Sequence, residues 1–238
     1  MGRAKLAPSA RHPGLRGGSS RAARLAPAKL AHRNVERIEL KAGAWLQLWH
    51  HWLDDDEANA LGAALVHEVA WEQRHIVLFG KRILQPRLIG WAGELPYRYS
   101  GQTLEPRAWP DVARPVLASV NQAAGAAFNH VLINRYRDGK DSMGYHADAE
   151  PELGPDPIVA TLSLGGRRRF LLRRHGKNHD EAPLALWLEP GSLLVMGGTC
   201  QRHYRHAIPR DAAPEVRERI SLTFRQLLAA PSETRSQK

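Results

Sequence analysis

The sequence predicts a mainly β protein with N-terminal helices, an α+β chain whose core is an antiparallel sandwich or jelly roll. Short runs that alternate apolar and polar residues recur from 131 to 225 between glycine and proline turns, as is typical of such cores. Apolar residues at helical spacing occur earlier, in the segments 54–69 and 112–128. With 238 residues and 43% hydrophobic side chains, the chain can bury a sizeable core within one domain.

Basic charge is concentrated near the N-terminus. The net charge is +10, from 34 Lys and Arg against 24 Asp and Glu, and residues 1–33 carry eight of the basic residues and no acid. This segment has no hydrophobic period, so we expect a disordered basic extension. It is interpreted as an arm attracted to nucleic-acid phosphates, an organelle transit peptide or an extension without function. We expect one domain at 34–230 and a C-terminal tail at 231–238.

Two features of the composition limit the expected cellular location of the protein. No apolar run approaches the ~20 residues that a membrane helix needs, so we expect no membrane partner. The single cysteine, Cys200, excludes an internal disulfide framework and favours a reducing compartment. We therefore expect a cytoplasmic (nucleoid-associated) or nuclear monomer, while the basic N-terminal segment leaves organelle import open.

The first part of the domain predicts one strand and two helices around an aromatic segment. Residues 35–40 alternate as an edge strand does. Acids at 54–57 precede apolar residues at helical spacing, which predicts a capped amphipathic helix over 54–69, and a second helix is expected over 112–128. Between them, residues 71–101 contain five aromatics among Gly and Pro, and we expect irregular loops that carry binding residues.

The second part of the domain predicts short strands. Gly165-Gly166 between two of them is a hairpin signal, and Pro190-Gly191 separates two others. The expected strands are 131–136, 158–164, 167–173, 185–188, 192–196 and 219–225.

The last expected strand alternates strictly between two faces. Its apolar residues face the core, and its other face carries Arg219, Ser221, Thr223 and Arg225. In a jelly roll this other face can line the lumen, where the two arginines would bind a small acid, because guanidinium groups pair bidentately with carboxylates. A strand with two solvent-facing arginines is the alternative.

The triplet His146-Ala147-Asp148 is expected to lie on one extended segment, a further strand. On an extended segment, residues two apart point the same way, so the imidazole and the carboxylate can meet at one point. With a second histidine they would complete the 2-His-1-carboxylate triad that holds non-haem Fe(II) and leaves positions open for a co-substrate and O2. His206 is the expected third ligand, and His203 is its rival. With twelve histidines in the chain, so short a motif also arises by chance.

The motifs together resemble the AlkB family of Fe(II)/2-oxoglutarate-dependent dioxygenases, which oxidatively dealkylate nucleic-acid bases. Order and spacing agree from about residue 75 to residue 227, so the extension at 1–33 lies outside the resemblance. The matching segments are Asn134-Arg135-Tyr136-Arg137-Asp138-Gly139, His146-Ala147-Asp148-Ala149-Glu150, Ile158-Val159-Ala160-Thr161-Leu162-Ser163-Leu164-Gly165, His206-Ala207-Ile208-Pro209 and Arg219-Ile220-Ser221-Leu222-Thr223-Phe224-Arg225.

The resemblance implies a double-stranded β-helix, which is a jelly roll, with a nucleotide-recognition lid within about 71–105. It implies Fe(II), 2-oxoglutarate and O2 as cofactors, with the iron bound by His146, Asp148 and His206. These three residues are also the expected catalytic residues. The residues expected to bind 2-oxoglutarate are Asn134, Tyr136, Arg219, Ser221 and Arg225.

Within the family, the segments Leu78-Phe79-Gly80-Lys81 and Tyr97-Arg98-Tyr99-Ser100-Gly101 look like the branch that acts on double-stranded DNA. That resemblance implies that Phe79 wedges into the base stack and that Tyr97 and Tyr99 flank a flipped base. The remaining expected substrate contacts are Ser100, Glu150 and Arg173. The basic residues Arg174, Lys177 and 167–169 would either meet phosphates or form a solvated hairpin face.

The expected function is repair of 1-methyladenine and 3-methylcytosine in alkylated DNA, in which 2-oxoglutarate decarboxylation is coupled to methyl hydroxylation and formaldehyde release. A related dioxygenase that acts on RNA or on a protein side chain is one alternative, and a non-catalytic nucleic-acid-binding protein is another.

Two residues depart from the family pattern. Ala149 stands where an acidic or amide residue is common, and Ser221 stands where some members have Asn.

Overall fold

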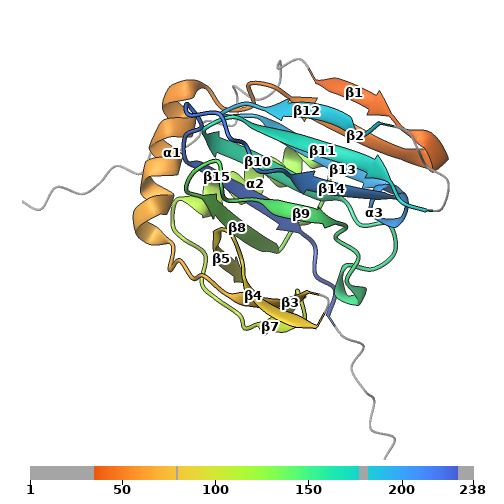
Figure 1. The fold of residues 1–238 in the computed structure, drawn as a ribbon, viewed down its shortest axis with the longest axis horizontal. Helices are drawn as coiled ribbons and strands as arrows, with labels where there is room; N and C mark the ends of the chain where they lie inside the picture. Colours follow the sequence, from red (N-terminus) through yellow and green to blue (C-terminus); the bar gives the residue numbers. More distant parts are fainter. Residues whose placement is uncertain (1–34, 79, 177–181, 230–238) are drawn as a thin grey trace, which may run out of the picture.

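A computed structural model of the chain describes residues 35–78, 80–176 and 182–229. These residues form two antiparallel β-sheets that face each other, with two longer helices outside them (Figure 1). The predicted N-terminal extension, the tail at 231–238 and the two side chains Phe79 and Lys177 lie outside the described residues.

The large sheet has seven strands in the order β1-β2-β13-β10-β15-β8-β5. Residues 35–40 were expected to form an edge strand, and β1 does lie at one edge of this sheet. The strands are β1 (Glu36–Glu39), β2 (Ala44–Trp49), β13 (Leu193–Gly198), β10 (Val159–Gly165), β15 (Arg219–Arg225), β8 (His130–Tyr136) and β5 (Leu88–Gly93).

The small sheet has four strands in the order β12-β11-β14-β9. Its strands are β12 (Leu184–Leu188), β11 (Arg168–Arg174), β14 (Tyr204–Ile208) and β9 (Met143–His146). The short helix α3 (Cys200–His203) leads directly into β14, and two 3-10 turns lie at Lys41–Gly43 and Pro151–Leu153.

The glycine pair Gly165-Gly166 does not form the predicted hairpin. Strand β10 belongs to the large sheet and β11 to the small one, so the pair carries the chain from one sheet to the other. Gly165 has φ +77°, and a Cβ atom there would lie 2.4 Å from the carbonyl oxygen of Glu218. The glycines therefore serve a close backbone crossing, which has the same local sequence signal as a hairpin turn.

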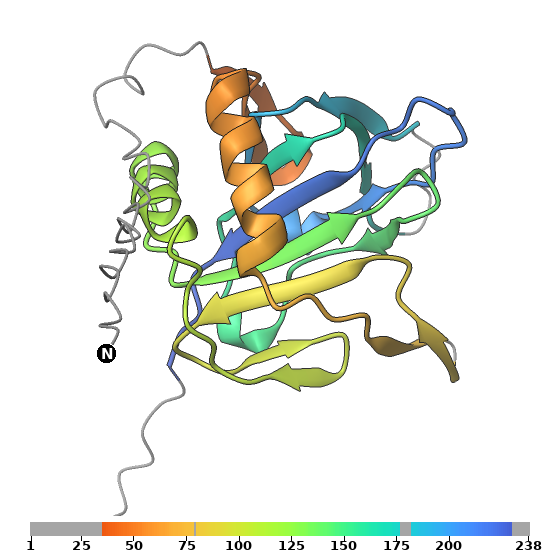
Figure 2. The ribbon, with the colours of Figure 1, turned by 90° about the vertical axis from the view of Figure 1, so that its left-hand side faces the viewer.

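The two helices cover the outer face of the large sheet. Helix α1 (Asp55–Glu68) begins with a capping box, in which the Asp54 side chain accepts from the backbone N–H of Glu57 and the Glu57 side chain accepts from that of Asp54. Helix α2 (Ala113–Ala124) ends at Gly125, which adopts the left-handed conformation. Figure 2 shows both helices on the same side of the sheet.

Alternation along β15 places its apolar side chains against the helices. Ile220, Leu222 and Phe224 are buried in one hydrophobic cluster with residues of α1 and α2. The opposite face of β15 lines the space between the two sheets, where a second cluster includes Phe170, Leu188 and other apolar side chains. The predicted jelly-roll core and its lumen are thus confirmed.

The segment 71–101, expected to be irregular, contains ordered strands instead. Strands β3 (His75–Leu78) and β4 (Lys81–Leu84) form one ribbon, and β6 (Tyr97–Tyr99) pairs with β7 (Gln102–Leu104) in another, while β5 joins the large sheet. Every residue of β4 is exposed. A strand without a buried side chain lacks the alternation by which strands are recognised.

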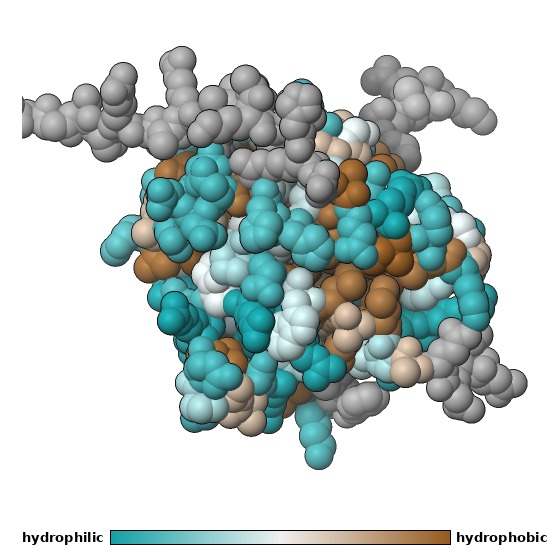
Figure 3. All heavy atoms as spheres, turned by 90° about the horizontal axis from the view of Figure 1, so that it is seen from above, coloured by the Kyte–Doolittle hydropathy of each residue, from teal (hydrophilic) through white to brown (hydrophobic). Residues whose placement is uncertain are grey.

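Hydrophilic side chains cover much of the face seen from above, where a group of hydrophobic side chains interrupts them (Figure 3).

In the part of the chain that the structure describes, no helix is long and apolar enough to cross a membrane.

Candidate active site

Strand pairing in the small sheet brings the three predicted metal ligands together. His146 ends β9 and lies opposite His206 on the neighbouring strand β14, with their ring centroids 4.2 Å apart. Asp148 follows two residues later, outside the strand, and its Oδ2 lies 3.7 Å from Nε2 of His206. One ligand atom from each residue lies within 4.8 Å of the others. His203, the rival ligand, lies in α3 and is not part of this cluster.

Hydrogen bonds orient two of these side chains and leave ligand atoms free. Nδ1 of His146 lies 2.9 Å from the carbonyl oxygen of Gly144; a carbonyl can only accept, so Nδ1 carries the proton and Nε2 is available as a ligand. Oδ1 of Asp148 accepts from Nε and Nη2 of Arg225 at 3.1 and 2.7 Å. Oδ2 of Asp148 is buried without a hydrogen-bond partner among the described residues.

The charges of the cluster suit a divalent cation at neutral pH. Burial by itself would raise the pKa of Asp148, but the charge of Arg225, the two histidines and the hydrogen bond from Arg225 together outweigh it and lower this pKa to about 2. Burial, with a smaller effect of His146, lowers the pKa of His206 to about 3, and burial also lowers the pKa of His146. The site therefore presents one carboxylate and two neutral imidazoles, the protonation state that metal binding requires. The donor set and the unpartnered Oδ2 fit Fe(II).

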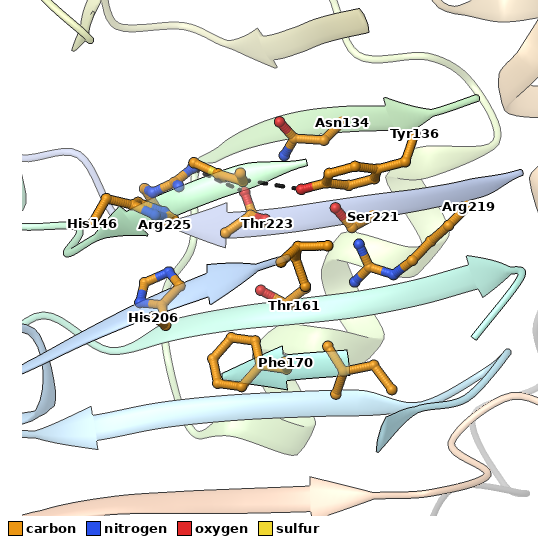
Figure 4. A pocket seen from close by; sticks show the side chains of 13 residues that line it. Asn134, Tyr136, His146, Thr161, Phe170, His206, Arg219, Ser221, Thr223 and Arg225 are labelled. Atoms are coloured by element: carbon orange, nitrogen blue, oxygen red, sulfur yellow. Dashed lines mark hydrogen bonds between the residues drawn. The ribbon is translucent and has the colours of Figure 1, made fainter. Parts of the chain in front are cut away.

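A pocket runs from the metal ligands between the two sheets. Figure 4 shows Arg225 close to His146 at one end and Arg219 close to Tyr136 at the other. Polar side chains line it on the large sheet, and apolar side chains together with His146 and His206 line it on the small sheet. The lining residues are Asn134, Tyr136, Met143, His146, Thr161, Phe170, Leu188, His206, Ile208, Arg219, Ser221, Thr223 and Arg225.

Arg219 is a buried cation that lacks an acidic partner among the described residues. Its Nη2 donates to Oγ of Ser163 at 2.9 Å, while Nε and Nη1 are buried with no partner there. Burial lowers the pKa of Arg219 to about 10, so it remains charged at neutral pH. Unsatisfied donors on a buried charge are unfavourable. The arrangement therefore fits a ligand carboxylate at the far end of the pocket.

The two arginines of β15, which the sequence predicts to bind a small acid, line the same pocket but have different partners among the described residues. Arg225 is committed to Asp148 and to the carbonyl oxygen of Thr223, and it lies beside the metal ligands. Arg219 alone has donors free for a carboxylate. Six residues of strand separate their backbones by about 20 Å, so the two side chains lie along the length of the pocket.

Arg87 is a site residue that sequence reasoning missed. It precedes β5, is almost fully buried, and donates through Nε to Oδ1 of Asn134 at 2.8 Å and through Nη1 to the carbonyl oxygen of Ser142 at 3.1 Å. Its Nη2 donates to the hydroxyl of Tyr99. Arg87 thus connects a predicted co-substrate residue to a predicted base-binding residue. No local pattern marks it, since all its partners are distant in sequence except Tyr99.

The predicted base-flanking tyrosines are buried in this structure. Tyr97 and Tyr99 have ring centroids 6.2 Å apart, and the guanidinium of Arg225 lies 5.4 Å from the ring centroid of Tyr97. The hydroxyl of Tyr97 has no hydrogen-bond partner among the described residues. Burial, followed by the charge of Asp148, raises the pKa of Glu150. Tyr97, Glu150 and Asp148 therefore gather on the lid side of the metal ligands.

The other predicted substrate residues lie further out. Ser100 is exposed in the turn after β6, with φ +48°, and Arg173 is exposed with its guanidinium 3.8 Å from the ring centroid of Tyr145. Within the basic run 167–169, Arg168 is wrong as a phosphate contact. It is fully buried and donates to the carbonyl oxygens of Asp138, Asp141 and Pro209.

Comparison with known proteins agrees with this geometry. The profile of the 2OG-Fe(II) oxygenase superfamily matches residues 46–225. The chain is 34% identical over 212 residues to the mouse protein named DNA oxidative demethylase ALKBH2, an alignment that covers 80% of this chain and 87% of that one. The chain belongs to the AlkB family of 2OG-Fe(II) oxygenases.

Other relatives extend the comparison. This AlkB-family chain is 35% identical over 191 residues to rat alpha-ketoglutarate-dependent dioxygenase alkB homolog 3, which covers 77% of the chain and 64% of the relative. It therefore spans just under two thirds of that protein. A solved structure titled "The structure of OsALKBH1" superimposes with a TM-score of 0.53 at 19% identity, covering 80% of this chain and all of that one. This likeness shows the fold alone.

His206→Ala should lower Fe(II) affinity at least tenfold, because it removes one of three ligands, whereas the matched variant His203→Ala should bind like the unaltered protein. The measurement is anaerobic Fe(II) titration followed by calorimetry, with circular dichroism to confirm folding. Equal loss in both variants would show that His206 is not the ligand.

Metal affinity should vary little between pH 7.5 and 5.5. Both imidazole pKa values are lowered, that of His206 to about 3, so protons compete with the metal less than they would at ordinary imidazoles. Two imidazoles with ordinary values near 6.5 would lose about a hundredfold in affinity over the same interval. Mn(II), a redox-stable substitute, allows the titration by calorimetry. A hundredfold decline would contradict the burial of the two rings.

Arg219→Gln should weaken binding of 2-oxoglutarate to the Mn(II)-loaded protein by about a hundredfold, because charge-assisted bidentate bonds are lost. The free protein should fold at least as stably, since the variant removes a buried cation with unpaired donors. Calorimetry measures the binding, and urea denaturation measures the stability. Arg217→Gln, an exposed arginine two residues earlier, is the control. Unchanged 2-oxoglutarate affinity would show that Arg219 does not bind the co-substrate.

Proposed function

We propose that this chain is an Fe(II)/2-oxoglutarate-dependent dioxygenase that removes N-alkyl groups from DNA bases. One observation carries the proposal: a His-Asp-His cluster and a buried arginine with free donors lie at opposite ends of one pocket. A ligand with a carboxylate at each end can reach both. The names of the relatives, which include DNA oxidative demethylases, favour alkylated DNA as the substrate.

Iron bound with 2-oxoglutarate and O2 would supply the oxidising power for hydroxylation of an N-methyl carbon. The protein's own residues would hold the metal and the co-substrate in position. His146, Asp148 and His206 would hold the metal, and Arg219 with Ser221 would hold the far carboxylate of the co-substrate. Arg225 keeps the Asp148 carboxylate ionised and turned toward the two histidines.

Apolar side chains on the small sheet exclude water from the reacting centre. Phe170 lies against the His206 ring, with centroids 5.4 Å apart, and Leu188 and Ile208 continue this wall. The opposite wall is polar, which orients the co-substrate through directed contacts. Hydroxylation of an N-methyl group produces an unstable hydroxymethyl amine, which releases formaldehyde and restores the base.

The lid would receive the damaged base. Tyr97 and Tyr99 are large aromatic surfaces beside the metal ligands, and a cationic methylated base on either ring gains roughly 0.5–2 kcal/mol of cation–π attraction. This favours 1-methyladenine and 3-methylcytosine over unmodified bases. Both tyrosines are buried in the structure, so base entry requires the β6–β7 ribbon to move. The substrate also requires the protein to reach a compartment that contains DNA.

The decisive assay follows loss of the methyl mass by mass spectrometry. Purified protein with Fe(II), ascorbate and 2-oxoglutarate should demethylate matched single- and double-stranded oligonucleotides that carry one 1-methyladenine or 3-methylcytosine. His146→Ala and Asp148→Ala should abolish turnover without unfolding the protein. Phe79→Ala should impair duplex repair and spare single strands if Phe79 acts as a wedge.

Two results would redirect the proposal. Succinate formation without demethylation of DNA would retain the iron chemistry and indicate an RNA or protein substrate; for RNA, the 2′-hydroxyl would be required. Absence of both succinate and demethylation with every alkylated base would indicate a protein that binds nucleic acid without catalysis.

A further inference from the structure

The outward surface of the small sheet combines arginines with aromatic side chains. Strand alternation turns His146, Phe170 and His206 into the pocket, so their sequence neighbours point the other way. We call the outward group the outer arginine face, and it consists of Arg169, Arg173, Arg205, Tyr145 and Trp187.

Register places these five residues side by side. Arg169 on β11 lies opposite Trp187 on β12, and Arg173 on β11 lies opposite Arg205 on β14. Small or aliphatic side chains lie between these two pairs, namely Ala185, Leu171 and Ala207. In the described part of the four strands, no acidic side chain occupies an outward position.

In the part of the chain that the structure describes, the arginines of this face have no acidic partner. Among the described residues, neither Arg169 nor Arg205 forms an ion pair, and Arg173 has only its stacking contact with Tyr145. Like charges directly opposite on neighbouring strands are destabilising, as Arg173 and Arg205 are here. A polyanion bound across the face would remove that repulsion, so its charge complements a phosphate backbone.

The aromatic residues add flat surfaces beside the charges. Trp187 is 43% exposed, unusual for so large an apolar side chain, and the guanidinium of Arg167 lies 4.7 Å from its ring centroid. Arginines interleaved with exposed aromatics are typical of surfaces on which single-stranded bases stack. A solvated face made of charges alone would give no reason for an exposed tryptophan.

The face begins at the edge of the candidate active site. Strand β9 is the edge strand of the small sheet (Figure 1), and Tyr145 directly precedes the ligand His146. Arg205 likewise directly precedes the ligand His206. A strand that leaves the pocket around the β9 edge therefore reaches the face without crossing another element of this sheet.

We propose that the outer arginine face binds the single-stranded nucleic acid that flanks the damaged base. This inference rests on the proposed function in one respect: the proposed active site is where the nucleic-acid strand would leave the pocket and pass onto the face. Three strand spacings, roughly 14 Å, separate β9 from β12, which corresponds to about four nucleotides at the axial rise of a stacked strand. The guanidinium groups contact phosphates, and Trp187 stacks on a base.

The first test compares Arg169→Gln and Arg205→Gln with Arg114→Gln, an exposed arginine on α2 whose ion pair with Asp111 is solvated. Fluorescence anisotropy measures binding of unmodified single-stranded DNA of about 16 and about 5 nucleotides. Each variant of the face should weaken binding of the longer strand and lower the slope of log affinity against log salt by about 0.7. Affinity for the shorter strand, which is still long enough to cover about four nucleotides of the face, should fall as well. Turnover of a short saturating substrate should stay as in the unaltered protein.

The second test concerns stacking. Trp187→Ala should weaken binding of the longer strand by about tenfold, while Trp187→Phe should restore most of the affinity because a ring remains. A solvent-exposed side chain can be removed without unfolding, which thermal denaturation checks. If all four variants bind both lengths as the Arg114→Gln control does, the proposal is wrong and the face is left to another partner, such as an acidic protein.

The binding assay contains neither Fe(II) nor a methylated base, so it is independent of catalysis. Loss of long-strand binding in the variants would support the outer arginine face even if demethylation were absent. If the protein demethylates DNA but the variants bind it normally, the proposed enzymatic activity would stand and the proposed binding role of the outer arginine face would be wrong.

Discussion

The ion pair between Arg225 and Asp148 is the interaction on which the site depends. Arg225 lies on β15 of the large sheet, and Asp148 follows β9 of the small sheet, so this pair joins the two sheets across the lumen. Both side chains are almost fully buried. Removal of either charge would leave the other without a partner in the interior, at a cost of about 3–5 kcal/mol. The same contact keeps one carboxylate oxygen directed toward the two histidines.

The candidate active site and the lid beside it contain polar groups that the described residues do not fully satisfy. Oδ2 of Asp148, Nε and Nη1 of Arg219 and the hydroxyl of Tyr97 are buried without hydrogen-bond partners among the described residues. Unpaired groups of this kind weaken the fold and strengthen ligand binding, because a metal or a carboxylate would meet them without displacing a protein partner. Arg87 connects this polar pocket to Tyr99 in the lid, so a movement of the lid would reach Asn134 on β8.

Several features were predictable because they depend on local periodicity. The alternation of β15 separated Ile220 and its apolar neighbours from Arg219 and Ser221, and the structure has the same division. The acids at 54–57 indicated the start of α1, and the capping box forms there. His-x-Asp spacing identified His146 and Asp148, although Asp148 lies beyond the strand on which both were expected. Strand β4 was missed, because all its side chains are exposed and leave no alternation by which a strand is recognised.

Sequence alone determined which side chains share a face, since that follows from a repeat of two residues along a strand. Only the tertiary structure decided which strands pair. Gly165-Gly166 is a hairpin signal locally, yet it joins two sheets, and Arg225 meets Asp148 from 77 residues away. The role of Arg87 depends on such contacts as well. Contacts between residues so far apart in sequence form only when the whole core packs, and the pattern of a short segment does not specify that packing.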